Sequence, residues 1–466
     1  MKKHIILLSI FSFSVGFSQE NISNVLSLSE YLGFVKSYHP IVKQANLILH
    51  TSEAQLLKAR GAFDPKIEVD YNKKQFQNKD YYNKLNAAFK IPTWYGIEVK
   101  ANFEENDGLY LNPESELPID GLYSAGVSIS LARGFLMNER MASLKKARFF
   151  INQAKEERQI LVNDILHNAS ISYFDWLKAY KEKMIFEAFL KNAEIRLYAT
   201  QKAFKAGDKP AIDTLEAGIT LKTRKLNLEK ARIQLIKSSL ALSSFLWLNN
   251  NTPVELQANM IPDIQTMDSI DTALNIALFN IENFDIEQHP KMKAISYKRE
   301  GLDMDRRLKK NNLLPKIDLQ YNVLTENSPQ LKALNTNNYK AGVSFSVPLF
   351  LRKERADYKL ATIKLKELDF ENQSTLVVLK NKINAIQLEL ASFQIQEEYT
   401  TTIVADYSTL LKAEERKFFL GESSLFLVNS RESKLIDVQL KAINLENAFF
   451  TSKAALFKTA AISILE

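Results

Sequence analysis

The chain has 466 residues, of which 46% are hydrophobic and 25% are charged, and its formal net charge is +7. Lysine and glutamate alternate throughout the segments that are expected to be helical, so this charge predicts solvated helix faces rather than a surface for nucleic acid. The chain has no cysteine, which excludes disulfides, thiolate metal sites and a cysteine nucleophile.

Residues 1–18 have the order of a secretory signal peptide. Lys2, Lys3 and His4 precede an apolar stretch, and the small Ser18 precedes Gln19, the expected mature start. Elsewhere no uncharged apolar run approaches the roughly 18 residues of a membrane-spanning helix. Any membrane insertion by the mature chain is therefore expected to use strands.

A first structural unit is predicted over residues 19–248. It begins with a helix over 25–60, and residues 66–131 then contain four segments in which apolar and polar side chains alternate, which predicts strands with two different faces. The polar faces are rich in serine, asparagine and glycine, which favours a membrane barrel over a soluble sheet. Aromatic residues near the strand ends favour the same reading; they are Tyr81, Tyr82, Trp94, Tyr95 and Tyr123.

The helical part of this unit is unusually long. Residues 135–206 contain neither glycine nor proline, which predicts one helix of about 100 Å. A tight turn at Gly207 precedes a return helix over 211–248, in which leucine recurs every seven residues as in a coiled-coil seam. Residues 249–272 contain two prolines and are expected to form an irregular equatorial connector.

The same series then starts again over residues 273–466. His39-Pro40 recurs as His289-Pro290, 250 residues later, and a helix, strands over 316–349, a long helix over 350–420 and a return helix over 422–466 follow. The chain is therefore predicted to be a tandem duplication with an α+β fold. Free strand edges are tolerated in a membrane only when closed, so several copies are expected to share one β-barrel, continued by a long periplasmic α-helical barrel.

Besides the glycine turns at Gly207 and Gly421, the chain has Leu131-Ala132-Arg133-Gly134-Phe135 after the first set of strands and Val347-Pro348-Leu349-Phe350 after the second. With these motifs, the duplicated organisation resembles the TolC family of outer-membrane efflux proteins, also called outer membrane factors. The resemblance covers essentially the mature chain and implies a homotrimer in the outer membrane of a Gram-negative cell, in contact with outer-membrane lipid and with a periplasmic helical extension. It further implies the exit duct of a tripartite efflux or type I secretion system, which works with a periplasmic adaptor (membrane fusion) protein and an inner-membrane pump.

The sequence departs from the family pattern in its strands. Family channels usually have two strands in each repeat and twelve in a trimer, whereas the first repeat here has four alternating segments. These segments predict either a wider barrel of up to eighteen strands or an extended hairpin outside the barrel.

Two groups of residues are candidates for function at the helical end. The family's second repeat can carry acids about two turns after the tip glycine, but Leu427 and Ser430 stand there in this chain, and the acids Asp213 and Glu216 stand at the matching places of the first repeat. Three residues apart, these two acids lie on one helix face and are a candidate cation-selective gate. The alternative is that they are simply solvated acids in the first turns of a helix, where negative charge is favoured. The second group is the candidate adaptor-docking tips, Gly207, Asp208, Lys209, Gly421, Glu422 and Ser423. The alternative interpretation is that these residues form ordinary glycine turns between helices.

Catalytic chemistry is not predicted. The five histidines lack metal-ligand spacing, and the chain has neither a phosphate-binding Gly-Lys-Ser/Thr loop nor a Gly-x-Ser-x-Gly motif. We therefore expect no enzyme activity, no cofactor, no metal and no nucleic-acid partner. The alternative function is a periplasmic coiled-coil scaffold or tether without a pore.

Overall fold

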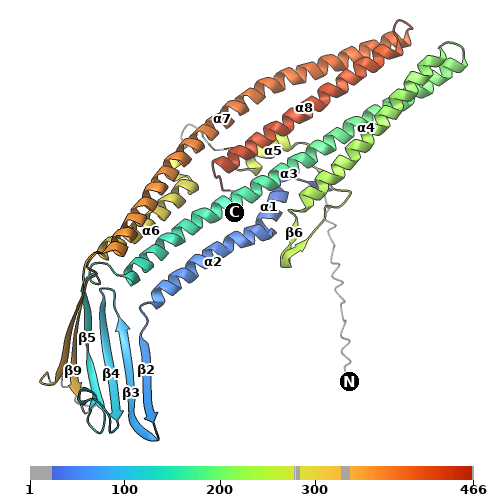
Figure 1. Cartoon of the computed structure of the whole chain (residues 1–466). Helices are drawn as coiled ribbons and strands as arrows, with labels where there is room; N and C mark the ends of the chain where they lie inside the picture. The colour runs from blue at the N-terminus through green and yellow to red at the C-terminus, as the bar shows by residue number, and fades with distance from the viewer. Residues whose placement is uncertain (1–23, 278, 280–283, 327–335, 464–466) are drawn as a thin grey trace, which may run out of the picture.

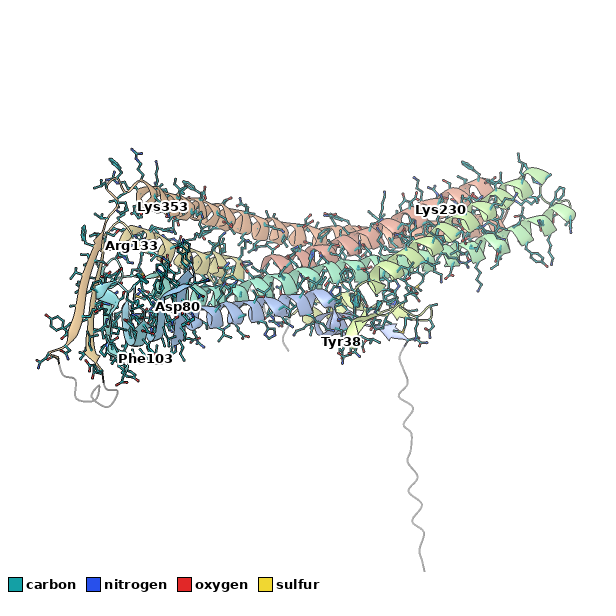
Figure 2. All side chains as sticks on the ribbon, turned by 60° about the horizontal axis from the view of Figure 1, so that its bottom comes forward. Tyr38, Asp80, Phe103, Arg133, Lys230 and Lys353 are labelled. Carbon is teal, nitrogen blue, oxygen red and sulfur yellow. The ribbon has the colours of Figure 1, made fainter. Side chains whose placement is uncertain are left out.

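The computed structural model of the chain describes residues 24–277, 279, 284–326 and 336–463, so the predicted signal peptide lies outside the described residues. The molecule is elongated, with one β-sheet at one end and two helical hairpins that reach to the other (Figure 1 and, turned by 60°, Figure 2). Within the described part of the chain, no helix combines the length and the hydropathy that crossing a membrane would need.

The first helical segment is broken, and the prediction of a single helix over 25–60 is wrong. After β1 (Val25–Leu26), the structure has α1 (Leu28–Tyr38) and α2 (Pro40–Gly61). Proline cannot donate to the helix ladder and keeps the residue before it extended, and His39 accordingly has ψ 132°. The imidazole Nδ1 of His39 then accepts a hydrogen bond from the N–H of Ile41 at 3.2 Å, which starts α2.

Six antiparallel strands form the sheet, and both repeats contribute to it. In spatial order they are β10, β9, β5, β4, β3 and β2. The four alternating segments of the first repeat are all present, and the β3–β4 hairpin lies between β2 and β5 rather than outside the sheet. The strand bounds are β2 (Lys66–Phe76), β3 (Lys79–Pro92), β4 (Ile97–Asp107), β5 (Leu122–Ala132), β9 (Lys316–Thr325) and β10 (Tyr339–Ser346).

The two long helices are α3 (Glu139–Lys205) and α7 (Arg352–Phe419). Each starts later than the predicted 135 and 350, because the side chain of Asn138 caps the N–H of Met141 at 2.9 Å and Leu351 adopts a left-handed φ of 48°. In the first repeat, α1, α2 and α4 (Ala211–Ser243) all pack along α3. In the second, α6 (Pro290–Asn311) and α8 (Leu425–Thr459) pack along α7 (Figure 1). Both return helices end before the predicted 248 and 466.

The connector between the repeats packs onto the main hydrophobic core, about halfway along the molecule. It contains β7 (Thr252–Pro253), which pairs with β6 (Trp247–Leu248), then β8 (Ile261–Pro262), which pairs with β1, and α5 (Thr266–Ala273). The core, called the equatorial core below, brings together fully buried side chains of α1, α3, α4, α5 and α8. They include Tyr31, Tyr173, Phe174, Trp176, Leu242, Ile270, Phe450 and Phe457. Three short 3-10 turns complete the elements of the described residues, η1 (Pro113–Ser115), η2 (Asn249–Asn251) and η3 (Ile286–Gln288).

Candidate functional site

The sheet has one apolar and one polar face. The pairing register keeps each face continuous across all six strands, up to a register shift between Lys74 and Gln75 near the end of β2. One row of directly paired residues is apolar from edge to edge and runs through Ile67, Phe89, Ala101, Ala125, Val323 and Tyr339. The next row is polar, apart from one glycine, and runs through Lys66, Lys90, Lys100, Gly126, Asn322 and Lys340. Because side chains alternate along a strand, a one-residue slip at any pairing would have mixed the two faces.

The apolar face is exposed over a wide area. Ile67 at one edge is 77% exposed and Val343 at the other is 74% exposed, and Phe89 and Val127 between them are also exposed. A soluble protein rarely leaves so large an apolar surface without a partner. The face therefore needs lipid or protein to cover it.

The polar face carries interlocked charges near the helical end of the sheet. Lys90 pairs with Glu68, and Glu98 pairs with Lys100 at 3.4 Å and with Arg140 of α3 at 3.3 Å. Next to them, Asp318 accepts a hydrogen bond from the hydroxyl of Ser130 and pairs with Lys316. This face suits water.

Aromatic side chains lie at both ends of the sheet, as predicted from the sequence. Beside the helices, Trp94 stacks on Phe63 with 5.8 Å between the ring centroids. At the far end, Tyr81 stacks on Tyr110 at 4.7 Å. These two aromatic pairs are separated by the length of the strands, and the Trp94 pair also packs against Ala59, Leu144 and Ala147 of the helices.

The two glycine turns have the same backbone structure. Gly207 and Gly421 have φ of 84° and 80°, in the left-handed region that glycine occupies without strain. In each turn the next residue's N–H closes a six-residue loop at 2.9 Å, from Asp208 to the carbonyl of Ala203 and from Glu422 to the carbonyl of Lys417. These are Schellman caps, and they reverse the chain within a few residues.

A groove of about 480 Å³ lies between the two tips. The ammonium of Lys209 lies 4.7 Å from the centroid of the Phe418 ring, so this tip residue of the first repeat faces helix α7 of the second. Phe419 beside it is 82% exposed. Further lining residues are Ile195, Ala199, Ala203 and Val428.

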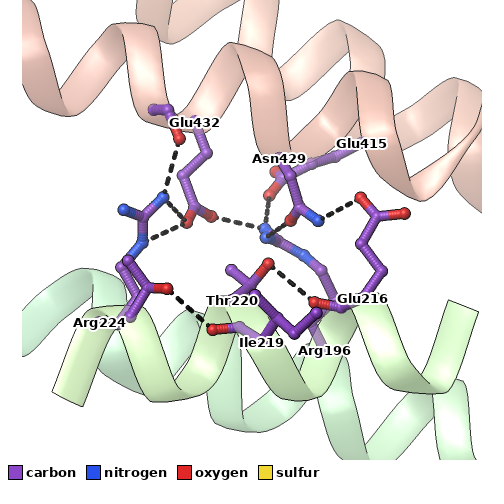
Figure 3. A network of polar contacts seen from close by, with 10 residues as sticks. Arg196, Glu216, Ile219, Thr220, Arg224, Glu415, Asn429 and Glu432 are labelled. Atoms are coloured by element: carbon purple, nitrogen blue, oxygen red, sulfur yellow. Dashed lines mark hydrogen bonds and ion pairs between the residues drawn. The ribbon is translucent and has the colours of Figure 1, made fainter. Parts of the chain in front are cut away.

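Behind the tips, a buried charge network joins the hairpins of the two repeats (Figure 3). Glu432 of α8 is 0% exposed and pairs with Arg196 of α3 at 2.7 Å and with Arg224 of α4 at 3.0 Å. Arg196 also reaches Glu415 of α7 at 3.2 Å and the side-chain oxygen of Asn429 at 3.1 Å. We call these five residues the inter-hairpin network.

The sequence reasoning missed this network, although it contained one signal. Arg224 falls among the small and apolar residues of the α4 coiled-coil seam, where a charge needs a buried partner. Its partner Glu432 lies 208 residues away, and no local pattern identifies it.

The two predicted gate acids have different surroundings. The carboxylate of Glu216 accepts a hydrogen bond from the side-chain nitrogen of Asn429 at 2.9 Å, so it extends the inter-hairpin network (Figure 3). Asp213 is half-buried in the first turn of α4, one turn nearer the tip. Across the described residues, no cluster of acids and histidines could hold a metal ion.

Comparisons with known proteins place these features in a family. The sequence profile of the family described as outer membrane efflux protein matches residues 105–246 and 286–461. No curated protein sequence matches the chain.

Three solved outer-membrane proteins share the fold at low sequence identity. The CmeC outer membrane channel of Campylobacter jejuni has a TM-score of 0.65 at 12% identity over 94% of this chain and 86% of its own. The outer membrane protein VceC of Vibrio cholerae has 0.67 at 13%, over 93% and 96%. The open MtrE outer membrane channel of Neisseria gonorrhoeae has 0.66 at 12%, over 93% and 88%. Since the family profile covers most of the sequence, the chain belongs to the outer membrane efflux protein family, whose members are transport proteins of the outer membrane and not enzymes.

Proposed function

We propose that the protein is a homotrimeric outer-membrane channel, the exit duct that passes substrates of a tripartite efflux or type I secretion system to the outside. The observation that carries this proposal is the six-stranded sheet. Its apolar face is exposed, and its edge strands β2 and β10 each have one edge that pairs with no other described strand. A sheet with these properties is stable in lipid only when its edges are closed.

The two faces give the sheet its orientation in the membrane. The apolar face contacts lipid, and the polar face with its lysine and glutamate pairs lines a water-filled lumen. The aromatic pairs at the two ends of the strands lie at the two membrane surfaces.

Closure by further copies preserves the antiparallel pattern. In an antiparallel sheet of six strands the two edge strands run in opposite directions, so β10 of one copy can pair with β2 of the next. Three copies of six strands make a barrel of eighteen strands, wider than the twelve-stranded barrel usual for the family.

The helices continue the duct into the periplasm. A helix of 67 residues such as α3 spans about 100 Å. At its far end lie the tips, which we assign to docking of a periplasmic adaptor that is itself bound to an inner-membrane pump. The groove between the tips and the exposed Phe419 offer an apolar surface for this contact.

Two matched substitutions on β5 test the channel and its orientation. Val127→Arg places a charge on the lipid face, at a cost of about 2–4 kcal/mol, and should prevent trimer assembly in the outer membrane. The neighbouring Ser128→Arg faces the lumen and should leave assembly intact. The readouts are heat-sensitive trimer migration in detergent and single-channel conductance in planar bilayers. A mature chain that stays monomeric in aqueous buffer without detergent, or trimers that never conduct, would refute the proposal.

The gate proposal concerns Asp213 and Glu216. In a trimer these acids form two rings near the narrow end, which favours cations over anions. The double variant Asp213→Asn, Glu216→Gln should lower the cation preference measured as a reversal potential in a salt gradient. If selectivity and conductance both stay at the wild-type values, these acids do not form a gate.

A further inference from the structure

The loop between β4 and β5, residues 108–121, lies at the end of the sheet away from the helices (Figure 1). It is longer than the loops that join β2 to β3 and β3 to β4, and it contains the short turn η1. Whether this loop points away from the barrel or over its opening is decided by the side chains that hold it.

Two side chains of the polar face hold the loop at Ser115. The ammonium of Lys84 on β3 donates to the Ser115 hydroxyl at 3.2 Å. The side-chain nitrogen of Asn106 on β4 donates to the Ser115 carbonyl at 3.0 Å. Lys84 and Asn106 are directly paired across the two strands and share the polar face with Asn72 of β2. The turn η1 therefore lies over the polar face.

The two ends of the loop are also fixed. At its start, the N–H of Tyr110 donates to the carbonyl of Tyr81 at 3.2 Å, and the two rings stack. At its end, Gly121 has φ 81° and lies so close to the Phe103 ring that a Cβ would be 2.6 Å from it. Lys84 itself is positioned 5.1 Å from the centroid of the Tyr82 ring. The loop is thus anchored at both ends and in its middle.

We propose that this loop folds into the lumen and constricts the outer mouth of the channel, so that it sets the upper size of what leaves. The inference rests on the proposed function, because the polar face must line the lumen. Three copies of the loop, one from each protomer, then project into the same opening. Glu114 and Glu116 flank the anchored serine and are exposed, so the constriction carries negative charge.

Loosening or removing the loop should raise conductance. In the double variant Lys84→Met, Asn106→Leu, the turn loses both contacts with the polar face. Deleting residues 109–120, which joins Gly108 to Gly121, removes the turn itself. We expect single-channel conductance in planar bilayers to rise by about twofold on deletion and by less in the double variant. The matched control is Lys79→Met, which makes the same change on β3 at a residue that does not contact the loop.

Cysteine labelling tests the same point without disturbing the anchor. The chain has no cysteine, so Glu114→Cys and Glu105→Cys each introduce a single reactive thiol. Glu105 is paired with Leu85 and lies on the apolar face at the same end of β4. A bulky cationic methanethiosulfonate should reduce the conductance of the Glu114→Cys channel and leave the Glu105→Cys channel unchanged.

The outcomes separate this inference from the proposed function. Trimers that conduct but respond neither to loop deletion nor to labelling at position 114 would overturn the constriction and leave the channel intact. Block at position 105 but not at 114 would place the loop outside the lumen and also overturn it. A wild-type trimer without conductance would instead refute the proposed function.

Discussion

The two repeats build the same helical hairpin but unequal parts of the sheet. Each begins its helix α2 or α6 at a His-Pro pair and turns at a glycine with left-handed φ. The first repeat, however, contributes four strands and the second two. The additional β3–β4 hairpin adds an even number of strands, so β5 keeps its direction and its faces, and both connections to the helices are preserved. A sheet of this kind can therefore be widened by hairpins but not by single strands.

The largest expected effect concerns the inter-hairpin network, which joins the two repeats in the helical half of the molecule. Glu432→Leu leaves the buried guanidinium of Arg224 without a carboxylate and leaves Arg196 with Glu415 alone, which should destabilise the fold by about 3–5 kcal/mol. Thermal unfolding followed by circular dichroism in detergent measures this loss.

A matched control separates burial from charge. Glu398→Gln removes a carboxylate from an exposed position on α7 and should change stability by less than about 0.5 kcal/mol. Similar melting curves for the two variants would mean that the inter-hairpin network contributes little.

Substitution of the tip glycine should lower stability by the same amount in the two repeats. Gly207→Ala and Gly421→Ala each force a side chain into the left-handed region, at a cost of about 1 kcal/mol. No atom lies within 4 Å of either added Cβ, so backbone strain alone sets the cost. Asparagine tolerates this conformation better and serves as the control at both positions. If the melting temperature falls by different amounts in the two variants, the two turns differ in their contribution to stability although their backbone geometry is the same.

Removing the additional hairpin should make the repeats alike. If Asn-Gly replaces residues 77–121, β2 joins β5 directly and each repeat has two strands, giving twelve in a trimer. Barrel diameter grows about linearly with strand number, so the lumen area and the conductance should fall to about half. Trimer migration in detergent verifies assembly. An unchanged conductance in assembled trimers would mean that β3 and β4 do not widen the lumen.

The smallest expected effect is a shared pH dependence of the His-Pro starts. Burial lowers the pKa of His39 and of His289 below the ordinary value of 6.5. In His289, Nδ1 accepts from the N–H of Lys291 at 3.0 Å and Nε2 lies 3.1 Å from the carbonyl of Thr459, which suits the neutral ring. The unfolded chain therefore binds more protons below about pH 6.5, so stability should fall as the pH drops through that value.

Paired substitutions test this effect. His39→Asn with His289→Asn keeps a capping side chain and removes the titrating ring, so the decrease in melting temperature from about pH 7.5 to about pH 5.5 should become smaller. His50→Asn, at an exposed position, is the control and should keep the wild-type decrease. An identical decrease in all three proteins would assign the pH dependence to other groups.

Local patterns predicted the elements well, and contacts between distant residues poorly. Alternation gave the strands, and the run without glycine or proline gave the long helices, because these signals depend only on neighbouring residues. Pro40 was wrongly accepted inside a helix, although its effect on His39 is also local. The position of the β3–β4 hairpin within the sheet depends on pairing between segments far apart in the chain, such as β5 with β9. The ion pair of Arg224 with Glu432 likewise joins residues far apart in the chain, so no local pattern predicts it.

The equatorial core joins the first and last helices of the described chain, and this has a consequence for how the protein folds. Leu26 and Leu28 from the start of the described chain are buried in the same cluster as Phe450 and Phe457 from its end. The aromatic side chains of α3 therefore lack part of their packing partners until α8 is available. A chain that is still being translocated cannot complete this hydrophobic core. Folding is therefore delayed until α8 has crossed the membrane, and the polypeptide stays unfolded during export.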